Sequence, residues 1–190
     1  NKVLIGGGTT SYNDFPVTSN SYQDASIQNT SVTREQADGF ISILSSDGST
    51  IEKSTYISTP NYDQVYFVEF DRFNNIYGYG QTQGGLFPTL RAPQADAGAG
   101  QFIVKLDRNL DSLEFSTTFG NGEGVGRVNI SPTAFLVDRC QNIYAAGWGE
   151  EIMRDQFNNP IEGDKSIANM LVINNGDPSI PSSTNTTDGN

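Results

Sequence analysis

The chain has 190 residues, 35% of them hydrophobic, and a formal net charge of −11 at pH 7 from 22 acidic and 11 basic residues. Because an acidic surface repels nucleic-acid phosphates and anionic lipids, the charge argues against a nucleic-acid partner and against binding to a membrane surface. Histidine is absent, which excludes the Ser-His and Cys-His catalytic triads and the usual zinc ligand sets. Carboxylate-only chemistry stays open, but no pair of acids stands out in the sequence.

Three further features limit the class of protein. The single cysteine, Cys140, allows no internal disulfide, and we expect it to have a structural or incidental role. No apolar run approaches the roughly 20 residues that a membrane-spanning helix needs, so no membrane-spanning segment is expected. Residues 120–126 contain four glycines but lack the Lys-Ser/Thr of a phosphate-binding loop. We therefore expect no cofactor.

Strand-like runs begin at the first residues and continue along the chain. The sequence starts inside one such run, Val3-Leu4-Ile5, so we expect it to be a piece of a longer protein. Two sets of four runs follow, bounded by Gly, Asp, Asn or Pro, and a fainter third set starts at Met170. The predicted strands are residues 40–44, 52–58, 65–70 and 76–81 in the first set, and 102–106, 113–119, 133–137 and 143–148 in the second. No segment has a sustained helical period, so the fold should be all-β.

The same phrases recur along the chain in the same order. Residues 71–77, with the pattern Asp-Arg, two spacers and Asn-Ile-Tyr, return as residues 138–144. The pattern Gly-x-Thr, four residues and Phe-Pro occurs at residues 8–16 and again at residues 80–88. Self-similarity at a roughly constant spacing indicates a tandem repeat.

Four short antiparallel strands in each repeat form the unit of a β-propeller blade. The sequence thus predicts a partial propeller with about two complete blades, residues 38–82 and 100–149, and parts of two others. The predicted division is the end of a preceding blade and a connection in 1–37, a blade and connection in 38–99, a blade and connection in 100–168, and the start of a following blade and a loop or tail in 169–190. Phe15 and Phe87 are expected to fill the gaps between blades.

The repeated turn between the third and fourth strands supplies four candidate structural residues: Asp71, Asn75, Asp138 and Asn142. Asp and Asn side chains accept hydrogen bonds from backbone N–H groups a few residues away and close turns in this way. We expect the two aspartates to accept such bonds within their own loops. The Ile-Tyr pair that follows each turn should then point into the blade.

Aromatic residues of the repeated fourth strand are the candidates for a ligand or partner surface. Tyr79 and Trp148 are the two selected, because aromatic faces stack on sugars and Trp148 replaces Gln81 of the preceding repeat. Alternating aromatic residues in a repeated strand more often pack within the core. Both interpretations stay open at this point.

Oxygen-bearing side chains at alternate positions, Asp107, Asn109 and Asp111, are compatible with a calcium loop. The glycine and the distal glutamate of such a loop are missing here. An ordinary turn closed by an aspartate side chain is the alternative interpretation, and it fits a connection between two strands better.

The sequence resembles a known bacterial repeat family. Residues 8–18, together with Gly39-Phe40-Ile41, Asp47-Gly48-Ser49 and Ser54-Thr55-Tyr56, resemble the SBBP β-propeller repeat. Residues 130–138, with Cys140, Asn142-Ile143-Tyr144 and Gly147-Trp148-Gly149, are similar to large secreted Bacteroidetes proteins that are associated with gliding motility. Those proteins leave the cell through the type IX secretion system.

The resemblance implies a secreted or cell-surface protein, on the outer face of the outer membrane, and it supplies no catalytic residue. The expected function is a non-enzymatic propeller module for protein–protein interaction or adhesion. Its expected partners are proteins of a surface or secretion assembly, or the remaining blades of the same protein. Asp111-Ser112-Leu113 also resembles a Bacteroidetes O-glycosylation site. The alternatives are a glycan-binding module, with polysaccharide as partner, and the scaffold part of a larger propeller enzyme.

Overall fold

The computed structural model describes residues 2–11, 14–27, 36–83, 88–92, 95, 99–120 and 130–148. These residues form strands and connections and contain no helix, so the all-β prediction is confirmed. The strands are β1 (Val3–Thr9), β2 (Asp38–Leu44), β3 (Ile51–Ile57), β4 (Asp63–Phe70), β5 (Ile76–Thr82), β6 (Gln101–Leu106), β7 (Leu113–Phe119), β8 (Ser131–Val137) and β9 (Ile143–Trp148). Every strand predicted in the two sets is present, with ends that differ by at most two residues.

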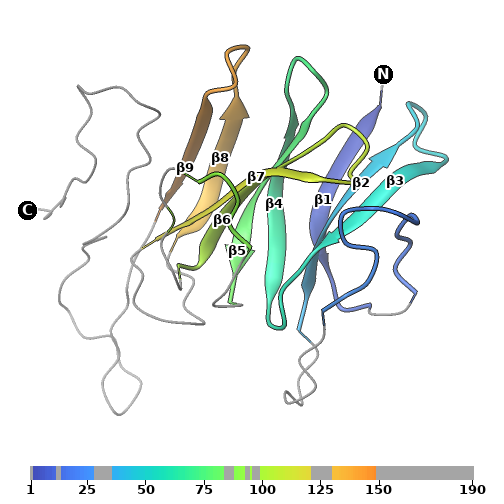
Figure 1. Cartoon of the computed structure of the whole chain (residues 1–190), viewed down its shortest axis with the longest axis horizontal. Coiled ribbons are helices and arrows are strands. Elements are labelled where there is room, and N and C mark those ends of the chain that lie inside the picture. The colour runs from blue at the N-terminus through green and yellow to red at the C-terminus, as the bar shows by residue number, and fades with distance from the viewer. Residues whose placement is uncertain are drawn as a thin grey trace, which may run out of the picture.

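The strands form three antiparallel sheets. Sheet A has the order β1-β2-β3, sheet B has the order β4-β5-β6-β7, and sheet C contains β8 and β9. In Figure 1 the sheets follow one another across the molecule in chain order. None of them closes on itself within the described residues.

The division into sheets differs from the blades expected from the repeat. The four strands within residues 38–82 do not form one sheet, because β2 and β3 pair with β1 while β4 and β5 pair with β6 and β7. The short connection 58–62 joins two sheets, and the longer connection 83–100 joins two paired strands. The complete four-stranded sheet therefore takes its strands from two successive repeats.

The sheets nevertheless repeat one another in register and in irregularity. Gly7 lies opposite Phe40 in sheet A, as Gly80 lies opposite Phe102 in sheet B. Register shifts occur between residues 43 and 44 and again between residues 105 and 106, one repeat later. Shifts also occur in β4 after Val65 and in β8 after Pro132. Strands β1-β2-β3 are thus equivalent to β5-β6-β7, and β8-β9 are equivalent to β4-β5.

Two apolar layers hold the sheets together. The layer between sheets A and B consists of Ile41, Ile43, Ile57, Val65, Ile76, Phe102, Val104, Leu106 and Leu110. The layer between sheets B and C consists of Tyr79, Ile103, Phe119 and Ile130, with Phe67, Phe115, Phe135 and Ile143 packed against them. Strand β4 packs on β1 and β2, and strand β8 packs on β4 and β5. Sheet B is therefore covered on both faces, which explains why all seven residues of β5 are buried.

The Phe-Pro connection between β1 and β2 covers one face of sheet A. Phe15 packs on the rings of Phe40 and Tyr56, with ring centroids 4.6 and 5.4 Å apart. These two residues lie on the face of sheet A that points away from sheet B, because their neighbours Ile41 and Ile57 face sheet B. Phe87, its counterpart, lies outside the described residues.

Candidate functional site

The turn between β4 and β5 is closed by the side chain of Asp71. Its Oδ1 accepts hydrogen bonds from the backbone N–H groups of Phe73 at 2.8 Å and Asn75 at 2.9 Å. Its Oδ2 accepts a bond from Nδ2 of Asn75 at 3.0 Å. Asn74 has a positive φ of 65°, which asparagine tolerates better than most residues. Asp71 and Asn75 together satisfy the polar groups of this tight loop.

The β8–β9 turn repeats this arrangement. Oδ1 of Asp138 accepts bonds from the backbone N–H groups of Cys140 and Asn142, both at 2.8 Å. Oδ2 accepts a bond from Nδ2 of Asn142 at 2.9 Å, and Gln141 has a φ of 66°. These bonds lower the pKa of Asp138, with the Asn142 side chain as the largest cause. The two turns therefore have the same chemistry.

Their surroundings differ. The side chain of Asp71 is fully buried, and Nζ of Lys105 lies 3.8 Å from its Oδ2 and 3.0 Å from Oε2 of Glu114. Lys105 also donates a hydrogen bond to Oε1 of Gln141 at 3.1 Å, which joins sheet B to the β8–β9 turn. Burial opposes the charge of Lys105, but Glu114 and Tyr77 outweigh it, so the pKa of the lysine is raised. Lys105 is therefore a charged residue that contacts both the β4–β5 turn, at Asp71, and the β8–β9 turn, at Gln141.

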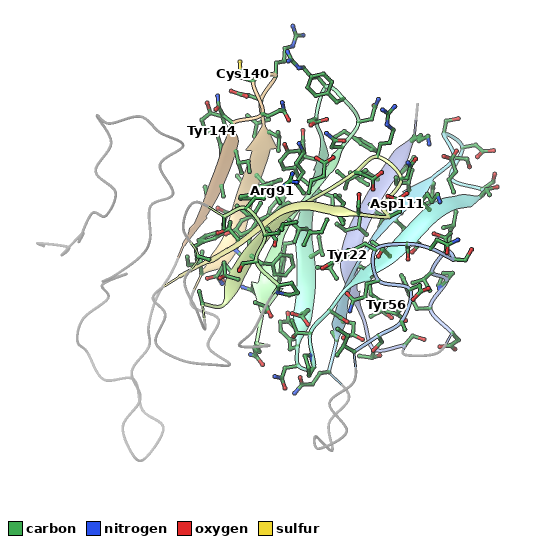
Figure 2. All side chains as sticks on the ribbon, in the orientation of Figure 1. Tyr22, Tyr56, Arg91, Asp111, Cys140 and Tyr144 are labelled. Atoms are coloured by element: carbon green, nitrogen blue, oxygen red, sulfur yellow. The ribbon has the colours of Figure 1, made fainter. Side chains whose placement is uncertain are left out.

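The Ile-Tyr pairs after the two turns have different environments. Ile76 and Tyr77 are buried, and Nζ of Lys105 lies 5.5 Å from the centroid of the Tyr77 ring. Tyr144 is 55% exposed. Figure 2 shows Tyr144 and Cys140 on the same hairpin, with Cys140 at its turn. The sequence-based expectation that both pairs point into a blade therefore needs correction at Tyr144, because no described strand covers that face of sheet C.

Tyr79 lies in the core between sheets B and C. Its side chain is 1% exposed and packs on the rings of Phe67, Phe119 and Phe135, with centroid distances of 6.2, 5.7 and 5.6 Å. Burial raises the pKa of Tyr79 to about 12. The ring has no exposed face for a sugar, so Tyr79 is a packing residue in this structure.

Trp148, the other candidate for a ligand surface, ends strand β9. Its backbone pairs with Ser131, while its side chain lies outside the described part of the structure. Of the two candidates, the structure therefore describes only the side chain of Tyr79, which lies in the core.

The β6–β7 turn uses Asp107 to bind backbone groups. Its carboxylate accepts bonds from the N–H groups of Asn109 and Asp111 at 2.9 Å and from Ser112 at 3.1 Å. Burial raises the pKa of Asp107, but the backbone bonds outweigh it and the net pKa is lowered. In the β2–β3 turn, Oγ of Ser45 accepts the equivalent bond from Thr50. Among the described residues, no group of three or more Cys, Asp or Glu side chains could hold a metal ion.

Two buried acids went unnoticed in the sequence. Asp63, the first residue of β4, has no exposed surface, and its Oδ2 accepts bonds from the backbone N–H and Oγ1 of Thr59 at 2.5 and 2.7 Å. Burial raises its pKa to about 7. Asp38, the first residue of β2, is 3% exposed, and burial raises its pKa as well. Each acid lies two residues before an apolar run, where the local sequence pattern does not indicate burial.

Glutamine side chains join sheets B and C at one further point. Nε2 of Gln81 and Nε2 of Gln101 both donate to the backbone oxygen of Ile130, at 2.7 and 3.1 Å. Polar side chains thus close turns at Asp71, Asp107 and Asp138, and they join sheets B and C at Gln81, Gln101 and Lys105.

A scan against models of protein families gives no match to this chain, and a search of curated proteins finds no significant similarity. In the described part of the chain, no helix is both long and apolar enough to span a membrane.

Proposed function

We propose that this chain is a segment of a β-propeller and that it acts without catalysis, as a protein-binding module of a secreted or cell-surface bacterial protein. The observation that carries the proposal is the repetition of one structural unit. Equivalent strands of successive sheets share their register, their register shifts and their turn bonds. Sheets that repeat in this way and stack face to face are the organisation of a propeller.

The non-enzymatic part of the proposal is supported by how the polar side chains are used. Asp71, Asp107 and Asp138 are bonded to backbone groups of their own turns, and Asp63 is buried against Thr59. A catalytic acid or nucleophile must reach its substrate. These carboxylates instead serve the fold.

The bacterial and surface part of the proposal comes from the resemblance to the SBBP repeat and to gliding-associated proteins. A repeated, rigid scaffold with exposed loops suits the presentation of a binding surface. The partners would be proteins of a cell-surface or secretion assembly linked to gliding motility, or further blades.

Binding to intact cells tests the proposed function. The purified chain can be labelled at Cys140, whose side chain is exposed in the β8–β9 turn, and applied to cells of a gliding Bacteroidetes species. Binding that is lost after protease treatment of the cells supports a protein partner. Binding that survives protease but is lost after periodate oxidation assigns the chain to the glycan-binding class. Absence of binding to treated and untreated cells overturns the proposed function.

A further inference from the structure

Asp38 lies on the face of sheet A that points away from sheet B. It is two residues before Phe40 in β2, and side chains two residues apart in a strand share a face. Thr9 of β1 lies directly opposite Asp38. The β2–β3 register, continued by one residue past the end of β3, places Ser58 on its other side. Two hydroxyl-bearing residues therefore flank the carboxyl group of Asp38.

The connection between β1 and β2 closes over this position. The backbone N–H of Ile27 donates a hydrogen bond to Oγ of Ser58 at 3.2 Å, which brings the preceding residue, Ser26, to the end of β3. Nε2 of Gln23 also contacts Oγ of Ser58, at 3.0 Å. Under this cover Asp38 is only 3% exposed. Burial raises the pKa of Asp38, and the nearby hydroxyl of Ser26 acts in the opposite direction.

Two oxygen atoms at this position are buried without hydrogen-bond partners. Among the described residues, neither Oδ2 of Asp38 nor Oγ of Ser26 has a donor or an acceptor. None of the ion pairs in the described part of the chain includes Asp38. A buried carboxylate without a compensating cation is costly, because burial removes its hydration. The position therefore favours a positively charged ligand or a proton.

A second buried carboxylate adds to the negative potential. The backbone N–H of Asp63 donates to the backbone oxygen of Ala37 at 2.8 Å, next to Asp38 in the chain. Oδ1 of Asp63 is also buried and without a partner among the described residues. Burial is the largest cause of the raised pKa of Asp63, and the charge of Asp38 adds to it. A cation beside Asp38 would reduce this repulsion between the two carboxylates.

The repeated fold does not itself require an acid at this position. Sheet B has the same strand register, and its positions equivalent to Asp38 and Ser58 are Gly100 and Gly120. The backbone N–H of Thr82 donates to the backbone oxygen of Gly100 at 3.0 Å, so the strands still pair there without a side chain. Strand pairing therefore does not explain the carboxylate of Asp38.

We propose that Asp38 binds a calcium ion on the face of sheet A that points away from sheet B, with Oγ of Ser26 as a second ligand and water completing the coordination. Carboxylate and hydroxyl oxygens are hard ligands that suit Ca²⁺, which accepts six to eight oxygens in a flexible geometry. A single carboxylate with neutral oxygens needs no group of three acidic side chains. It places the dissociation constant in the weak range of about 10⁻⁴–10⁻³ M. The site does not depend on the proposed function.

Thermal denaturation of the purified chain, in EDTA and at about 10 mM Ca²⁺, tests the proposal. For a dissociation constant of about 1 mM, we expect Ca²⁺ to raise the melting temperature by about 3 °C or more. Asp38→Asn keeps the shape of the side chain and should lose this increase. Asp38→Gly copies Gly100 of sheet B and should lose it as well. An increase in both variants as large as in the parent protein, or no increase in the parent protein, overturns the proposal.

Asp107→Asn is the matched control. It also removes one acid, and it lies in the turn whose oxygen spacing is compatible with a calcium loop, so it should keep the increase. Loss of the increase in Asp107→Asn but not in Asp38→Asn would place the ion in the β6–β7 turn and overturn the site at Asp38. Mg²⁺ at the same concentration should give a smaller increase, because it demands a stricter geometry. Equal increases with both ions in all variants would show that salt only screens the net charge of −11, which also overturns the proposal.

Terbium luminescence tests the location of the ion independently. Tb³⁺ substitutes for Ca²⁺ and emits when a nearby tyrosine is excited. Tyr56 lies opposite Phe40 and so shares the face of Asp38, and burial followed by the charge of Asp38 raises the pKa of Tyr56. We expect Tb³⁺ emission that Ca²⁺ suppresses, that Asp107→Asn keeps and that Asp38→Asn loses. Emission from Asp38→Asn equal to that of the parent protein contradicts an ion at Asp38.

Discussion

At the scale of single residues, the β4–β5 and β8–β9 turns have the same hydrogen-bond arrangement in two different environments. Asp71 and Asp138 accept the same three hydrogen bonds, with lengths that agree within 0.1 Å. The carboxylate of Asp71 is fully buried and faces Lys105, whereas Asp138 is only partly buried and no lysine faces it among the described contacts. The bonds are therefore set by the local sequence, and their contribution to stability is set by burial.

Substitution of these aspartates should show that difference. Asp71→Ala leaves the N–H groups of the turn without their acceptor and removes the buried carboxylate that faces Lys105, and we expect it to lower the free energy of unfolding by roughly 1–3 kcal/mol. Asp138→Ala is the matched variant, and its effect should be clearly smaller because water replaces the lost acceptor. Urea denaturation of the two variants and the parent measures both effects. Equal losses would mean that burial does not decide the contribution of this turn.

Asp63 predicts a dependence of stability on pH. Burial raises its pKa from 3.8 to about 7 in the folded state, so the folded chain holds this proton more tightly than the unfolded chain. The contribution of Asp63 to the free energy of unfolding is therefore largest below pH 3.8 and falls as pH rises to about 7. Asp38 has a raised pKa and contributes with the same sign.

Denaturation at pH 5 and pH 8 tests this expectation. The parent protein should lose stability between these two values, and Asp63→Asn should lose less because the variant has no proton to release. Asp47→Asn is the control, since hydrogen bonds from Ser45 and Ser49 lower the pKa of Asp47 to about 2 and it stays ionised throughout. If Asp63→Asn lost as much stability between pH 5 and pH 8 as the parent protein, Asp63 would not be the cause of the pH dependence.

At the scale of strands, the sequence predicted the elements but not their partners. Turn residues and β-branched runs define each strand locally, and all eight predicted strands are present. Strand pairing depends on which strands lie side by side in space. A tandem repeat has the same period whichever strand begins a sheet, so the period does not show where one sheet ends and the next begins. The short segment 58–62 suggested a hairpin, yet β3 and β4 belong to different sheets. Connection length was therefore a poor guide to pairing.

The candidate site was predictable to the same extent. Asp71 and Asp138 close their turns through hydrogen bonds to residues within five positions in the chain, so this role could be predicted from the local sequence. The burial of Tyr79 and the exposure of Tyr144 depend on whether another sheet covers the strand. That information lies in the stacking of sheets, which the local pattern does not encode.

Glycine substitutions test the register of β1 and β5. A Cβ at Gly80 would lie 2.2 Å from the backbone oxygen of Gln64, and one at Gly7 would lie 2.9 Å from the Phe40 ring. We expect Gly80→Ala and Gly7→Ala to destabilise the fold by about 1–3 kcal/mol, the usual range for overpacking. A Cβ at Gly8 would lie 3.3 Å from the flexible side chain of Gln64 and 3.5 Å from Cβ of Ala37, so Gly8→Ala should have little effect. The melting temperatures of the three variants are compared by thermal denaturation. A severe loss in Gly8→Ala alone would support Gly8, the first residue of the repeated Gly-x-Thr pattern, as the equivalent of Gly80.

At the scale of the whole molecule, the described sheets form a stack with uncovered ends. Leu136 and Tyr144 lie opposite each other on the outward face of sheet C and are 52% and 55% exposed. Glu69 and Tyr77 occupy the equivalent positions in sheet B, beneath sheet C. Uncovered apolar faces of this kind promote association. The formal net charge of −11 acts against it, because copies of the chain repel one another.

This balance predicts how self-association responds to salt. The screening length falls from about 30 Å at 0.01 M ionic strength to about 8 Å at 0.15 M, so added salt weakens the repulsion between copies. Leu136 and Tyr144 are uncharged, so added salt does not weaken their burial in a contact between copies. Residues 1–190 should therefore sediment as larger species at 0.15 M than at 0.01 M ionic strength. The double variant Leu136→Glu, Tyr144→Glu should reduce the association, and Phe73→Glu, in an exposed turn, should not. A monodisperse monomer at both ionic strengths, or association that salt disrupts, would show that the outward face of sheet C does not mediate self-association.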